Sequence, residues 1–444
     1  MRPFGTHERP LAVAVIGSGI SGLSAAWLLS KAHKVTLFEA DARFGGHSHT
    51  VDVGNHAVDT GFIVYNERTY PNLTALFSHL SISTQPTEMS FSVSIDGGRL
   101  EYSGSNLTGL FAQPSNALSA RFWSMLLDIR RFYRTAPVDQ RKLGPMSLEA
   151  YLSSRGYGEA FRDDHLYPMA AAIWSTPTAQ IGDYPAAALI DFFNNHGLLT
   201  LTDRPVWRTV TGGSRAYVRQ MLATMDVRAI SNCPVVSMRR EPGFIEVTDR
   251  SGNVHVFDHA VLAVHADDAL AILADPTPSE RSLLGAFRYT PNEAFLHRDP
   301  TLMPRRRAAW ASWNYLSSMA ETRKASVSYW MNRLQRLSEK QPVFVTLNPL
   351  REPAADTVIC RETYTHPMFD AAAIAAQESL WSLQGVRRTW FCGAYFGAGF
   401  HEDGLQSGLA VAEALGGVAR PWRVQNPSGR IQIPAGAQVP SVAA

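Results

Sequence analysis

Three glycines near the N-terminus have the spacing of a turn that binds phosphate groups. They form the pattern G-x-G-x-x-G directly after an apolar run at 11–16. In such a turn the first glycine allows a tight bend, the second lets a pyrophosphate approach the backbone, and the third lets helix and strand pack closely. The N–H groups that open the following helix favour negative charge. The pattern therefore predicts a dinucleotide site at Gly17, Ser18, Gly19, Ser21 and Gly22.

The elements around this turn come in the order that such a site requires. The run at 11–16 is predicted to be a buried parallel strand, 23–31 a helix and 35–38 a second strand. The second strand ends at Glu39, about 20 residues beyond the first glycine, where a carboxylate can accept both ribose hydroxyls. A glycine triplet alone is often only a turn, but the whole strand–turn–helix–strand–acid order favours nucleotide binding.

The residues that follow Glu39 indicate which nucleotide is bound. The run from Glu39 to Thr50 fits E-x-x-x-R-x-G-G-x-x-x-T, which resembles the continuation found in FAD proteins of the amine oxidase and phytoene desaturase superfamily. Arg43 would add a fixed fork of donors near the phosphates, and Gly45 and Gly46 permit backbone close to the cofactor. The resemblance therefore implies FAD.

Two further segments are expected at the cofactor. The turn at 59–61 could bring the backbone of Gly61 against the flavin ring system, although an ordinary strand-to-turn transition is the alternative. In the resembling superfamily, the strand that begins at 235 presents its backbone to the adenine. That role is carried over to Val236.

The run from Trp390 to Gly408 is the second strong signal. A strand enters a glycine-rich loop, and a helix is expected from about 404 to 415. In the same superfamily this unit closes over the flavin, and the N–H groups at the helix start face the pyrimidine edge of the ring. A helix N-terminus stabilises the negative charge of a reduced flavin. Gly404 and Leu405 are assigned to this contact, and Gly393 in the preceding loop is also assigned to the cofactor site.

The C-terminal motif departs from the superfamily at one position. Ala394 stands where many relatives carry an acid that binds a phosphate or the ribityl chain, so Glu402 or Asp403 is expected to take that task. Cys392 does not lie where monoamine-oxidase relatives attach flavin covalently. The resemblance therefore implies non-covalent FAD.

Composition limits the remaining function classes. The 444 residues suffice for two or three domains, with 45% apolar and 18% charged residues. A net charge of +2 and the lack of a nucleic-acid motif argue against nucleic-acid binding. Three scattered cysteines form no C-x-x-C pair, which favours a reducing cytoplasm and no metal site. No apolar run reaches transmembrane length.

The expected architecture is α/β and discontinuous. Residues 1–84, 205–284 and 385–420 would form a Rossmann-like FAD-binding domain with a parallel sheet and a β-meander. Residues 85–204 and 285–384 would form an α+β substrate domain with a second, antiparallel sheet, and 421–444 a disordered tail. The second sheet is rich in aromatic residues that either fill a core or wall a pocket for a long apolar substrate: Trp310, Trp313, Tyr329 and Trp330.

A helix predicted at about 119–134 is amphipathic. One face is apolar and another carries Arg130, Arg131 and Arg134. Such a helix can lie on an anionic membrane surface or simply cover a core. The expected location is therefore the cytoplasm, with peripheral contact at the inner membrane face as one interpretation.

Several segments resemble one branch of the superfamily more closely. GSGISGLSAAWLL, DTGFIVYN, LMPRRRAAWASWNY, SYWMNRLQRL and FCGAYFGAGFHEDGLQSGL are similar to FAD-dependent proteins encoded beside cyclopropane-fatty-acyl-phospholipid synthases. The resemblance implies desaturation of an unsaturated or methyl-branched acyl chain of a lipid, and a functional partnership with such a methyltransferase. An amine oxidase acting on a small amine is one alternative. A flavin-bound isomerase, or a non-redox partner of the methyltransferase, is the other.

The implied cofactor suggests the mechanism. A flavin accepts a hydride at N5, and the protein positions a C–H bond against it. An acyl CH₂ is not acidic, so the reaction needs an activated position, such as one allylic to a double bond, and a base for the second proton. The candidates lie in segments expected near the ring, with a structural role as the alternative for each: His47, Tyr65, Tyr395 and His401.

Overall fold

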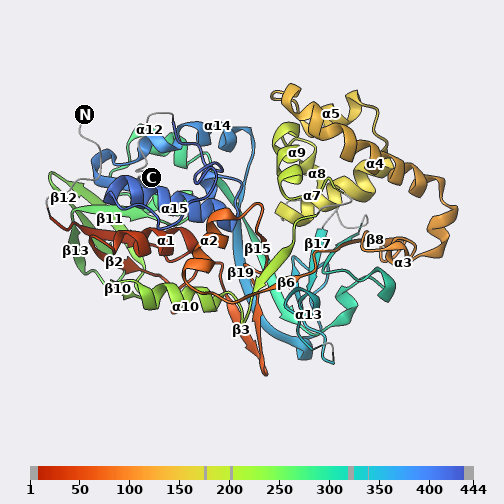
Figure 1. Cartoon of the computed structure of the whole chain (residues 1–444), viewed down its shortest axis with the longest axis horizontal. Coiled ribbons are helices and arrows are strands. Elements are labelled where there is room, and N and C mark those ends of the chain that lie inside the picture. Colours follow the sequence, from red (N-terminus) through yellow and green to blue (C-terminus); the bar gives the residue numbers. More distant parts are fainter. Residues whose placement is uncertain (1–8, 175–177, 201–203, 319–324, 339, 435–444) are drawn as a thin grey trace.

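Segments from the two ends and the middle of the chain build a five-stranded parallel sheet. The computed structural model describes residues 9–174, 178–200, 204–318, 325–338 and 340–434 (Figure 1). The strand order is β10-β2-β1-β14-β20, and every neighbouring pair is parallel. The strands are β1 (Ala12–Ile16), β2 (Lys34–Phe38), β10 (Val227–Ile230), β14 (His259–Leu262) and β20 (Thr389–Phe391). The predicted parallel sheet is confirmed.

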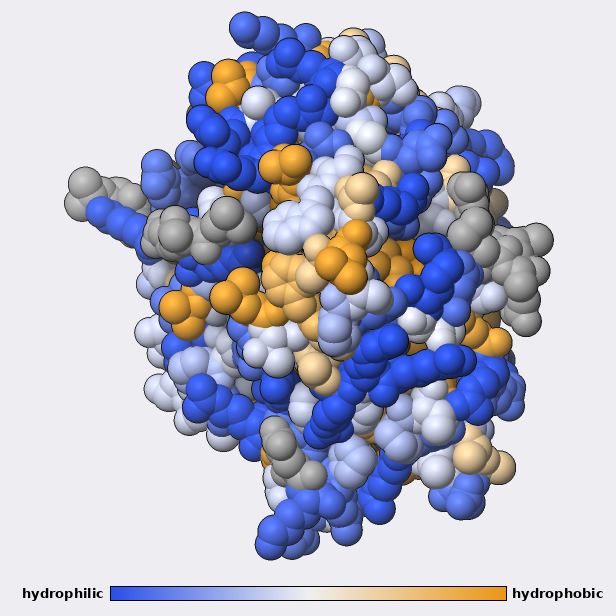
Figure 2. All heavy atoms as spheres, turned by 90° about the vertical axis from the view of Figure 1, so that its right-hand side faces the viewer, coloured by the Kyte–Doolittle hydropathy of each residue, from blue (hydrophilic) through white to orange (hydrophobic). Residues whose placement is uncertain are grey.

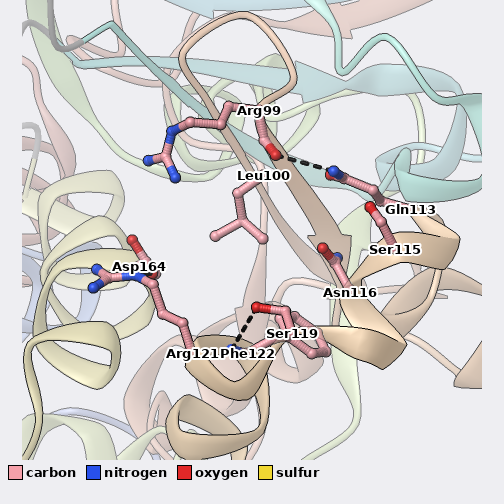
Figure 3. Close-up of a pocket in the computed structure, with 9 residues that line it drawn as sticks. All are labelled: Arg99, Leu100, Gln113, Ser115, Asn116, Ser119, Arg121, Phe122 and Asp164. Carbon is pink, nitrogen blue, oxygen red and sulfur yellow. Dashed lines mark hydrogen bonds and ion pairs between the residues drawn. The ribbon is translucent and has the colours of Figure 1, made fainter.

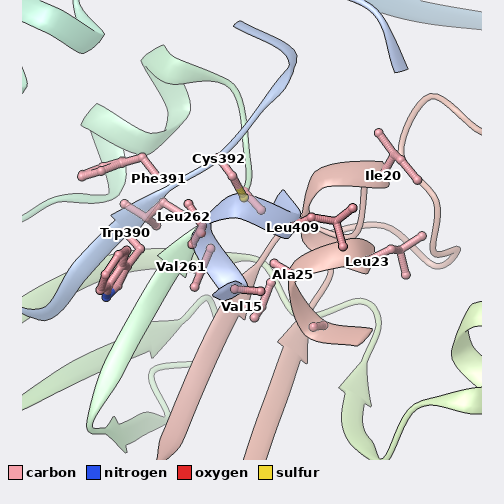
Figure 4. Packing of buried hydrophobic residues seen from close by; sticks show 14 of the residues in the cluster. Val15, Ile20, Leu23, Ala25, Val261, Leu262, Trp390, Phe391, Cys392 and Leu409 are labelled. Atoms are coloured by element: carbon pink, nitrogen blue, oxygen red, sulfur yellow. The ribbon is translucent and has the colours of Figure 1, made fainter. Parts of the chain in front are cut away.

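Two helices bring the chain ends together. They are α1 (Ile20–Leu29), which begins before the predicted start at 23, and α15 (His401–Gly416). Both are buried almost all round because other elements cover them on every side. Their close approach depends on Gly408, where a Cβ would lie only 2.2 Å from the carbonyl oxygen of Ser21. Figure 4 shows Leu409 of α15 among side chains of α1 and the sheet.

A β-meander and a set of helices complete this unit. The predicted β-meander is confirmed and consists of three antiparallel strands, and helices pack around it and the sheet. These elements are β11 (Val235–Glu241), β12 (Phe244–Asp249), β13 (Val254–Phe257), α2 (Pro71–His79), α10 (Arg215–Thr224), α11 (Ala266–Ile272), α12 (Pro278–Leu284) and α14 (Ala371–Leu380).

The second unit contains a seven-stranded sheet in the order β19-β15-β18-β17-β16-β7-β8. It is mixed rather than antiparallel as predicted, because β16 pairs with β7 in parallel. That pair joins strands from two distant chain segments that no hairpin connects. The strands are β7 (Phe91–Ile95), β8 (Leu100–Ser103), β15 (Arg288–His297), β16 (Trp313–Ser317), β17 (Ala325–Trp330), β18 (Phe344–Leu347) and β19 (Val358–Met368).

Helices form the outer part of the second unit, on the right of Figure 1. The predicted amphipathic helix is α4, which continues to Asp139 and is capped at its start by the hydroxyl of Ser119. The helices are α3 (Leu107–Leu110), α4 (Ala120–Asp139), α5 (Leu148–Ser154), α6 (Glu159–Phe161), α7 (Tyr167–Trp174), α8 (Thr178–Ile181), α9 (Ala186–Asn195) and α13 (Met331–Leu334).

Short strands connect the two units. A hairpin of β3 and β4 and a small three-stranded sheet of β5, β9 and β6 lie where the chain passes between them. These strands are β3 (Thr50–Val53), β4 (His56–Asp59), β5 (Tyr65–Asn66), β6 (Thr84–Thr87) and β9 (Trp207–Val210).

Two expectations about the C-terminal third need correction. The chain returns to the first unit before 385, because buried residues from Phe369 to Leu383 pack in the core of the parallel sheet. The segment 421–434 is not a disordered tail. Trp422 stacks on Trp27 of α1, with ring centroids 5.8 Å apart, and Ile431 is buried. Residues 435–444 lie outside the described residues.

No helix within the described parts of the chain is long and apolar enough to span a bilayer.

Candidate functional site

A cavity of about 1090 Å³ lies at the carboxyl ends of the parallel strands and continues into the second unit. Gly17, Glu39 and Ala263, which directly follow β1, β2 and β14, line it, and so does Gly393, two residues beyond β20. The chain leaves β1 for β2 on one side of the sheet, while β14 lies on the other. Such a switch point is where open α/β sheets bind nucleotides.

The glycine turn has the geometry that its sequence predicts. Gly17 has φ +98°, and a Cβ there would lie 2.7 Å from the carbonyl oxygen of Ala263. A Cβ at Gly22 would lie 1.9 Å from the carbonyl oxygen of Gly17, so this position sets the helix against the strand. Gly19 lines the cavity, and a Cβ there would have no neighbour within 4 Å. The open space in front of Gly19 fits a pyrophosphate.

The predicted ribose ligand lies in the same cavity. One carboxylate oxygen of Glu39 accepts hydrogen bonds from the amide (3.0 Å) and the hydroxyl of Ser18, and the other accepts from the amide of Asp41 at 2.9 Å. These bonds hold the acid beside the glycine turn. Ser21 also lines the cavity.

The loop after β2 approaches the glycine turn, and of its two predicted cofactor glycines Gly46 lines the cavity whereas Gly45 does not. Gly45 and Gly46 have φ +119° and +55°, and a Cβ at Gly46 would lie 3.0 Å from the Cα of Gly19. Arg43 lines the cavity, but one guanidinium nitrogen donates to the carbonyl oxygen of Gly46 at 2.7 Å. Arg43 therefore also stabilises the loop that carries the two glycines.

Gly61 lies in the cavity wall, where the absence of a side chain lets the loop that carries His47 approach closely. A Cβ there would be 2.1 Å from the carbonyl oxygen of His47, and the amide of the next residue, Phe62, donates to that oxygen at 2.7 Å. The turn therefore fixes the backbone of His47 against the wall.

Asp59, in the same turn, connects the two units. Its buried carboxylate accepts hydrogen bonds from the hydroxyl of Thr50 (2.5 Å), the amide of Ser214 (2.8 Å) and the side-chain amide of Gln335 (2.8 Å). Thr50 and Ser214 belong to the first unit, whereas Gln335 follows α13 in the second. Burial raises the pKa of Asp59 to about 6.

The stability that depends on Asp59 is expected to fall as the pH rises from about 4 to about 6. Its pKa is raised from 3.8 to about 6, so the folded state holds the proton more tightly than the unfolded chain in this window. A shift of about two pKa units corresponds to about 3 kcal/mol. The difference in urea unfolding free energy between the wild-type protein and Asp59→Asn should decrease by this amount across the window. A difference that is constant with pH would contradict it.

The C-terminal helix begins at His401, not near Gly404, which changes the expected contacts. The amide of Gly404 donates to the carbonyl oxygen of Phe400 at 3.1 Å, and Leu405 is fully buried in the core. The amide of Asp403 also donates to the carbonyl oxygen of Phe400, at 3.0 Å, so among the described residues the N–H groups at the helix start without a backbone partner are those of His401 and Glu402. Neither Gly404 nor Leu405 lines the cavity, whereas Gly393 does.

The acids proposed to replace the missing carboxylate have other partners. Glu402 accepts hydrogen bonds from the amides of Asn72 and Leu73 at the start of α2, at 3.0 and 2.9 Å. Asp403 forms an ion pair with Arg430. Both acids are fully buried and lie outside the cavity wall, so this expectation is wrong.

Three of the four proposed catalytic residues line the cavity. They are His47, Tyr395 and His401. Tyr65 instead packs between Tyr70 and Phe77, with ring centroids 6.2 and 5.3 Å away, and does not reach it.

His401 and Tyr395 differ in how they are held. The ring of His401 stacks on Phe62, with centroids 3.7 Å apart, and its Nε2 lies 2.8 Å from the hydroxyl of Tyr217. Burial lowers the pKa of His401 to about 3, so it is neutral. The buried hydroxyl of Tyr395 has no hydrogen-bond partner among the described residues.

Val236, the residue assigned to the adenine, is exposed on β11 next to a bulge and does not line the cavity.

Sequence reasoning missed a cluster around His47. The rings of His366, His265 and Tyr364 lie 5.7, 6.0 and 5.1 Å from its ring, and all four residues line the cavity. Burial lowers the pKa of His366 to about 4 and that of His47 well below its usual range, so both are neutral. Nε2 of His47 is buried without a hydrogen-bond partner in the described part of the chain. The alternating residues of 358–366 would have predicted the strand that carries two members of this cluster.

A smaller pocket of about 260 Å³ is a weaker candidate. It lies between β8 and the start of α4 (Figure 3). Its two arginines are already paired, Arg99 with Asp96 at 3.0 Å and Arg121 with Asp164 at 2.7 Å. The pocket therefore lacks the free charge that a small ionic ligand would need.

Comparison with known proteins agrees with the geometry of the larger cavity. The family model described as flavin containing amine oxidoreductase matches residues 20–416. The chain belongs to this family, whose cofactor is FAD. The glycine turn, Glu39 and the unpartnered polar atoms in the cavity wall fit FAD.

Individual relatives are more distant. Coproporphyrinogen III oxidase of Mycobacterium tuberculosis is 26% identical over 288 residues, which are 60% of this chain and 61% of that protein. The chain thus spans about three fifths of the length of these curated relatives. Among solved structures, a fatty acid isomerase from P. acnes that produces CLA has a TM-score of 0.65 at 15% identity, with 91% of this chain and 98% of that chain covered. Cyclohexylamine oxidase from Brevibacterium oxydans gives 0.63 at 15%, covering 92% and 99%. These similarities establish the shared fold.

Proposed function

We propose that this protein is an FAD-dependent oxidoreductase that dehydrogenates an unsaturated or methyl-branched acyl chain of a lipid. The observation that carries the proposal is the lining of the cavity within the second unit. There the wall is built from large apolar and aromatic side chains of helices and sheet, among them Tyr133, Met169, Ile173, Trp313, Tyr329 and Leu347. A cavity with such an extended apolar lining suits an extended apolar substrate.

Of the four aromatic residues noted in the sequence, two line the cavity and two fill a core. Trp313 and Tyr329 are opposite each other on β16 and β17 and line the cavity. Trp310 and Trp330 pack in a separate core cluster with Phe344. Alternate residues of a strand face opposite sides of the sheet, so only one side contributes to the cavity.

Charge supports an acyl lipid over the alternatives. On the part of the wall formed by the second unit the acids are Glu88, which is paired with Arg333 at 3.1 Å, and Glu362 on β19, whose carboxylate lies 3.5 Å from Nδ1 of His49, so each offers a cationic amine a partner that is already engaged. Among the described lining residues the cations are Arg43, beside the glycine turn, and Arg204, on the exposed rim. A porphyrinogen with several carboxylates would need more cations than these, whereas an anionic lipid head group needs one.

The residues around His47 would manage the proton of the reaction. Two C–H bonds break as the double bond forms: one leaves as a hydride, which bound FAD takes up, and one as a proton, which a protein base takes up. His47 is neutral and its Nε2 has no hydrogen-bond partner among the described residues, so with the ring proton on Nδ1 this nitrogen can accept a proton. His366 and Tyr364 hold the imidazole in place by their contacts with its ring.

The cofactor is proposed to be held without a covalent bond. Cys392 is fully buried behind the cavity wall and does not line it, and burial raises the pKa of its thiol, which disfavours the nucleophilic thiolate. The resemblance to proteins encoded beside cyclopropane-fatty-acyl-phospholipid synthases supports a methyltransferase of that kind as the functional partner.

The test is anaerobic mixing of the purified holoprotein with total phospholipid, and separately with amines and with coproporphyrinogen. Bleaching of the flavin absorbance by phospholipid, with a new double bond in the recovered acyl chains, is expected. Bleaching by amines or by the porphyrinogen alone would replace the proposal with the corresponding oxidase. Bleaching by none of them, together with a shifted double bond, would indicate an isomerase.

Replacement of His47 by glutamine is expected to slow flavin reduction by about 100-fold, the usual contribution of a general base. The flavin content should not change, because the backbone carbonyl of His47, which packs against Gly61, is retained. Stopped-flow reduction by the active phospholipid measures the rate. His401→Gln is the comparison, since His401 already has hydroxyl partners. Equal effects of the two variants would argue against a distinct role for His47.

A further inference from the structure

The outward side of α4 carries apolar and basic residues in one stripe. Trp123, Leu127, Arg130, Arg134 and Val138 follow one another at three- and four-residue intervals, and all five are exposed. Such intervals place side chains on a single face of a helix. No acidic residue interrupts this face, and the structure describes every residue of the helix.

The acids of α4 are turned toward the protein instead. Asp128 forms an ion pair with Arg131 at 3.0 Å, and Asp139 pairs with Arg155. The side chains of these two acids are mostly buried. The two arginines of the outward stripe form no ion pair with the described residues. The helix therefore presents uncompensated positive charge to its surroundings.

The apolar part of the stripe continues onto the neighbouring segments. Leu118, directly before the helix cap, is 92% exposed, and Leu107 at the start of α3 is 76% exposed, compared with 66% for Leu127 and 47% for Trp123. Figure 2, which shows this side of the molecule, has hydrophobic residues gathered near the centre among hydrophilic ones. Exposed apolar side chains that cluster in this way mark an interaction site.

We propose that this surface docks on an anionic lipid bilayer. The docking face consists of Leu107, Leu118, Trp123, Leu127, Arg130 and Arg134. Apolar side chains of a helix that lies in the membrane plane enter the boundary between head groups and acyl chains, where tryptophan is favoured, and arginines beside them meet the lipid phosphates.

Charge argues against a second copy of the chain as the occupant. A twofold dimer through this face would bring the same patch of both copies together. Arg130 and Arg134 would then face the arginines of the other copy without an acid between them. An anionic surface provides the complementary charge that a second copy lacks.

The docking face adjoins the rim of the large cavity. Gly104 and Ser105 are exposed and line the cavity, and the chain runs from them directly into α3. On the other side, Tyr133 lines the cavity and is the neighbour of Arg134 in α4. A bilayer held at this face would therefore lie beside an opening of the cavity.

The test is sedimentation of the holoprotein with vesicles. One set contains equal parts of phosphatidylglycerol and phosphatidylcholine, and the other contains phosphatidylcholine alone. Binding to the mixed vesicles is expected to be at least about tenfold tighter, and to weaken in high salt, because the basic residues act through charge. The variants Trp123→Ser/Leu127→Ser and Arg130→Glu/Arg134→Glu should each bind the mixed vesicles at least about tenfold more weakly.

Matched variants on the first unit control for loss of exposed apolar area and of charge. Val254 and Val256 on β13 are 56% and 59% exposed, and Arg228 and Arg250 are exposed as well. Val254→Ser/Val256→Ser and Arg228→Glu/Arg250→Glu should leave vesicle binding unchanged. All variants change surface residues, so flavin absorbance and thermal midpoint should show that each is folded.

Three outcomes would overturn the proposal. The holoprotein would remain in the supernatant with both vesicle types, or the control variants would lose as much binding as the docking variants. Alternatively, sedimentation velocity without lipid would show a dimer that Trp123→Ser/Leu127→Ser dissociates, which would assign the face to a second copy. Flavin reduction by detergent-dispersed phospholipid needs no docking face, so the proposed reaction and the docking surface can fail independently.

Discussion

Replacement of Gly22 by alanine is expected to abolish flavin binding and to destabilise the folded protein. The added Cβ would lie 1.9 Å from the carbonyl oxygen of Gly17 and 3.1 Å from the Cβ of Ala263. Neither contact involves the flexible end of a side chain, so α1 must move away from β1. We expect a loss of about 3 kcal/mol, at the upper end for overpacked cores, and at least about a 100-fold weaker affinity for FAD. Urea unfolding of the apoprotein and flavin titration measure the two effects.

Gly19→Ala is expected to weaken FAD binding without changing the stability of the folded apoprotein. A Cβ at Gly19 has no protein atom within 4 Å, so the apoprotein should unfold at the same urea concentration as the wild type. Flavin affinity should still fall, because the methyl group would occupy the space in front of the turn that a pyrophosphate needs. If Gly19→Ala bound FAD normally, the pyrophosphate would not lie at this turn. Gly104→Ala, which also meets no atom within 4 Å, is the neutral control.

The parts of the fold that were predicted correctly depend on local patterns. The apolar run of β1, the glycine turn and the start of β2 lie close together in sequence, and their order alone specifies a strand–helix–strand unit. The parallel pairing of β16 with β7 joins residues more than 200 positions apart, Trp313 opposite Phe91. No local pattern specifies such a pairing, because the alternation of side chains along a strand indicates which residues share a face but not which distant strand lies beside it.

The candidate site also divides into features that local sequence predicts and features that depend on distant segments. The glycine turn and Glu39 were found because their function fixes both residue type and spacing. The histidine cluster was missed because its members come from three separate segments: His47 follows β2, His265 follows β14 and His366 lies on β19. Tyr65 was placed wrongly for a related reason. It lies near Gly61 in sequence, but the short strand β5 turns its ring into the core beside Tyr70.

The composition of the C-terminal segment wrongly predicts disorder at 421–434, although the sequence of α15 indicates that this segment is needed for packing. A helix buried on all sides that carries Glu402, Asp403 and Glu413 must supply each carboxylate with partners, since unpaired buried charge is costly. Arginines are natural partners for buried carboxylates, and three of them lie in the segment beyond the helix, of which Arg420 pairs with Glu413 and Arg430 with Asp403. The high content of proline, glycine and alanine favours disorder, and the match between the acids of α15 and the arginines of the segment is not apparent from composition.

Replacement of Arg420 by alanine is therefore expected to destabilise the protein by about 3–5 kcal/mol, the cost of leaving one member of a buried ion pair unpaired. Its guanidinium donates two bonds of 2.7 Å to the carboxylate of Glu413, one of 2.9 Å to the side-chain oxygen of Asn72 and one of 2.8 Å to the carbonyl oxygen of Pro427. These contacts join α15, α2 and the C-terminal segment. Unfolding in urea, followed by far-UV circular dichroism, measures the loss.

Two further variants show whether the loss comes from the unpaired carboxylate. Arg288 forms an equally short ion pair with Asp370 at 2.6 Å, but its side chain is largely exposed, so Arg288→Ala should cost at most about 1 kcal/mol. Glu413→Leu/Arg420→Leu removes both charges of this pair, so neither partner is left buried and unpaired, and stability should recover most of the way to the wild type. If Arg420→Ala cost no more than Arg288→Ala, the C-terminal segment would not be held by this pair. Recovery in the double variant would show that the loss in Arg420→Ala comes from the unpaired carboxylate of Glu413. The C-terminal segment would then be required to neutralise this buried acid of α15.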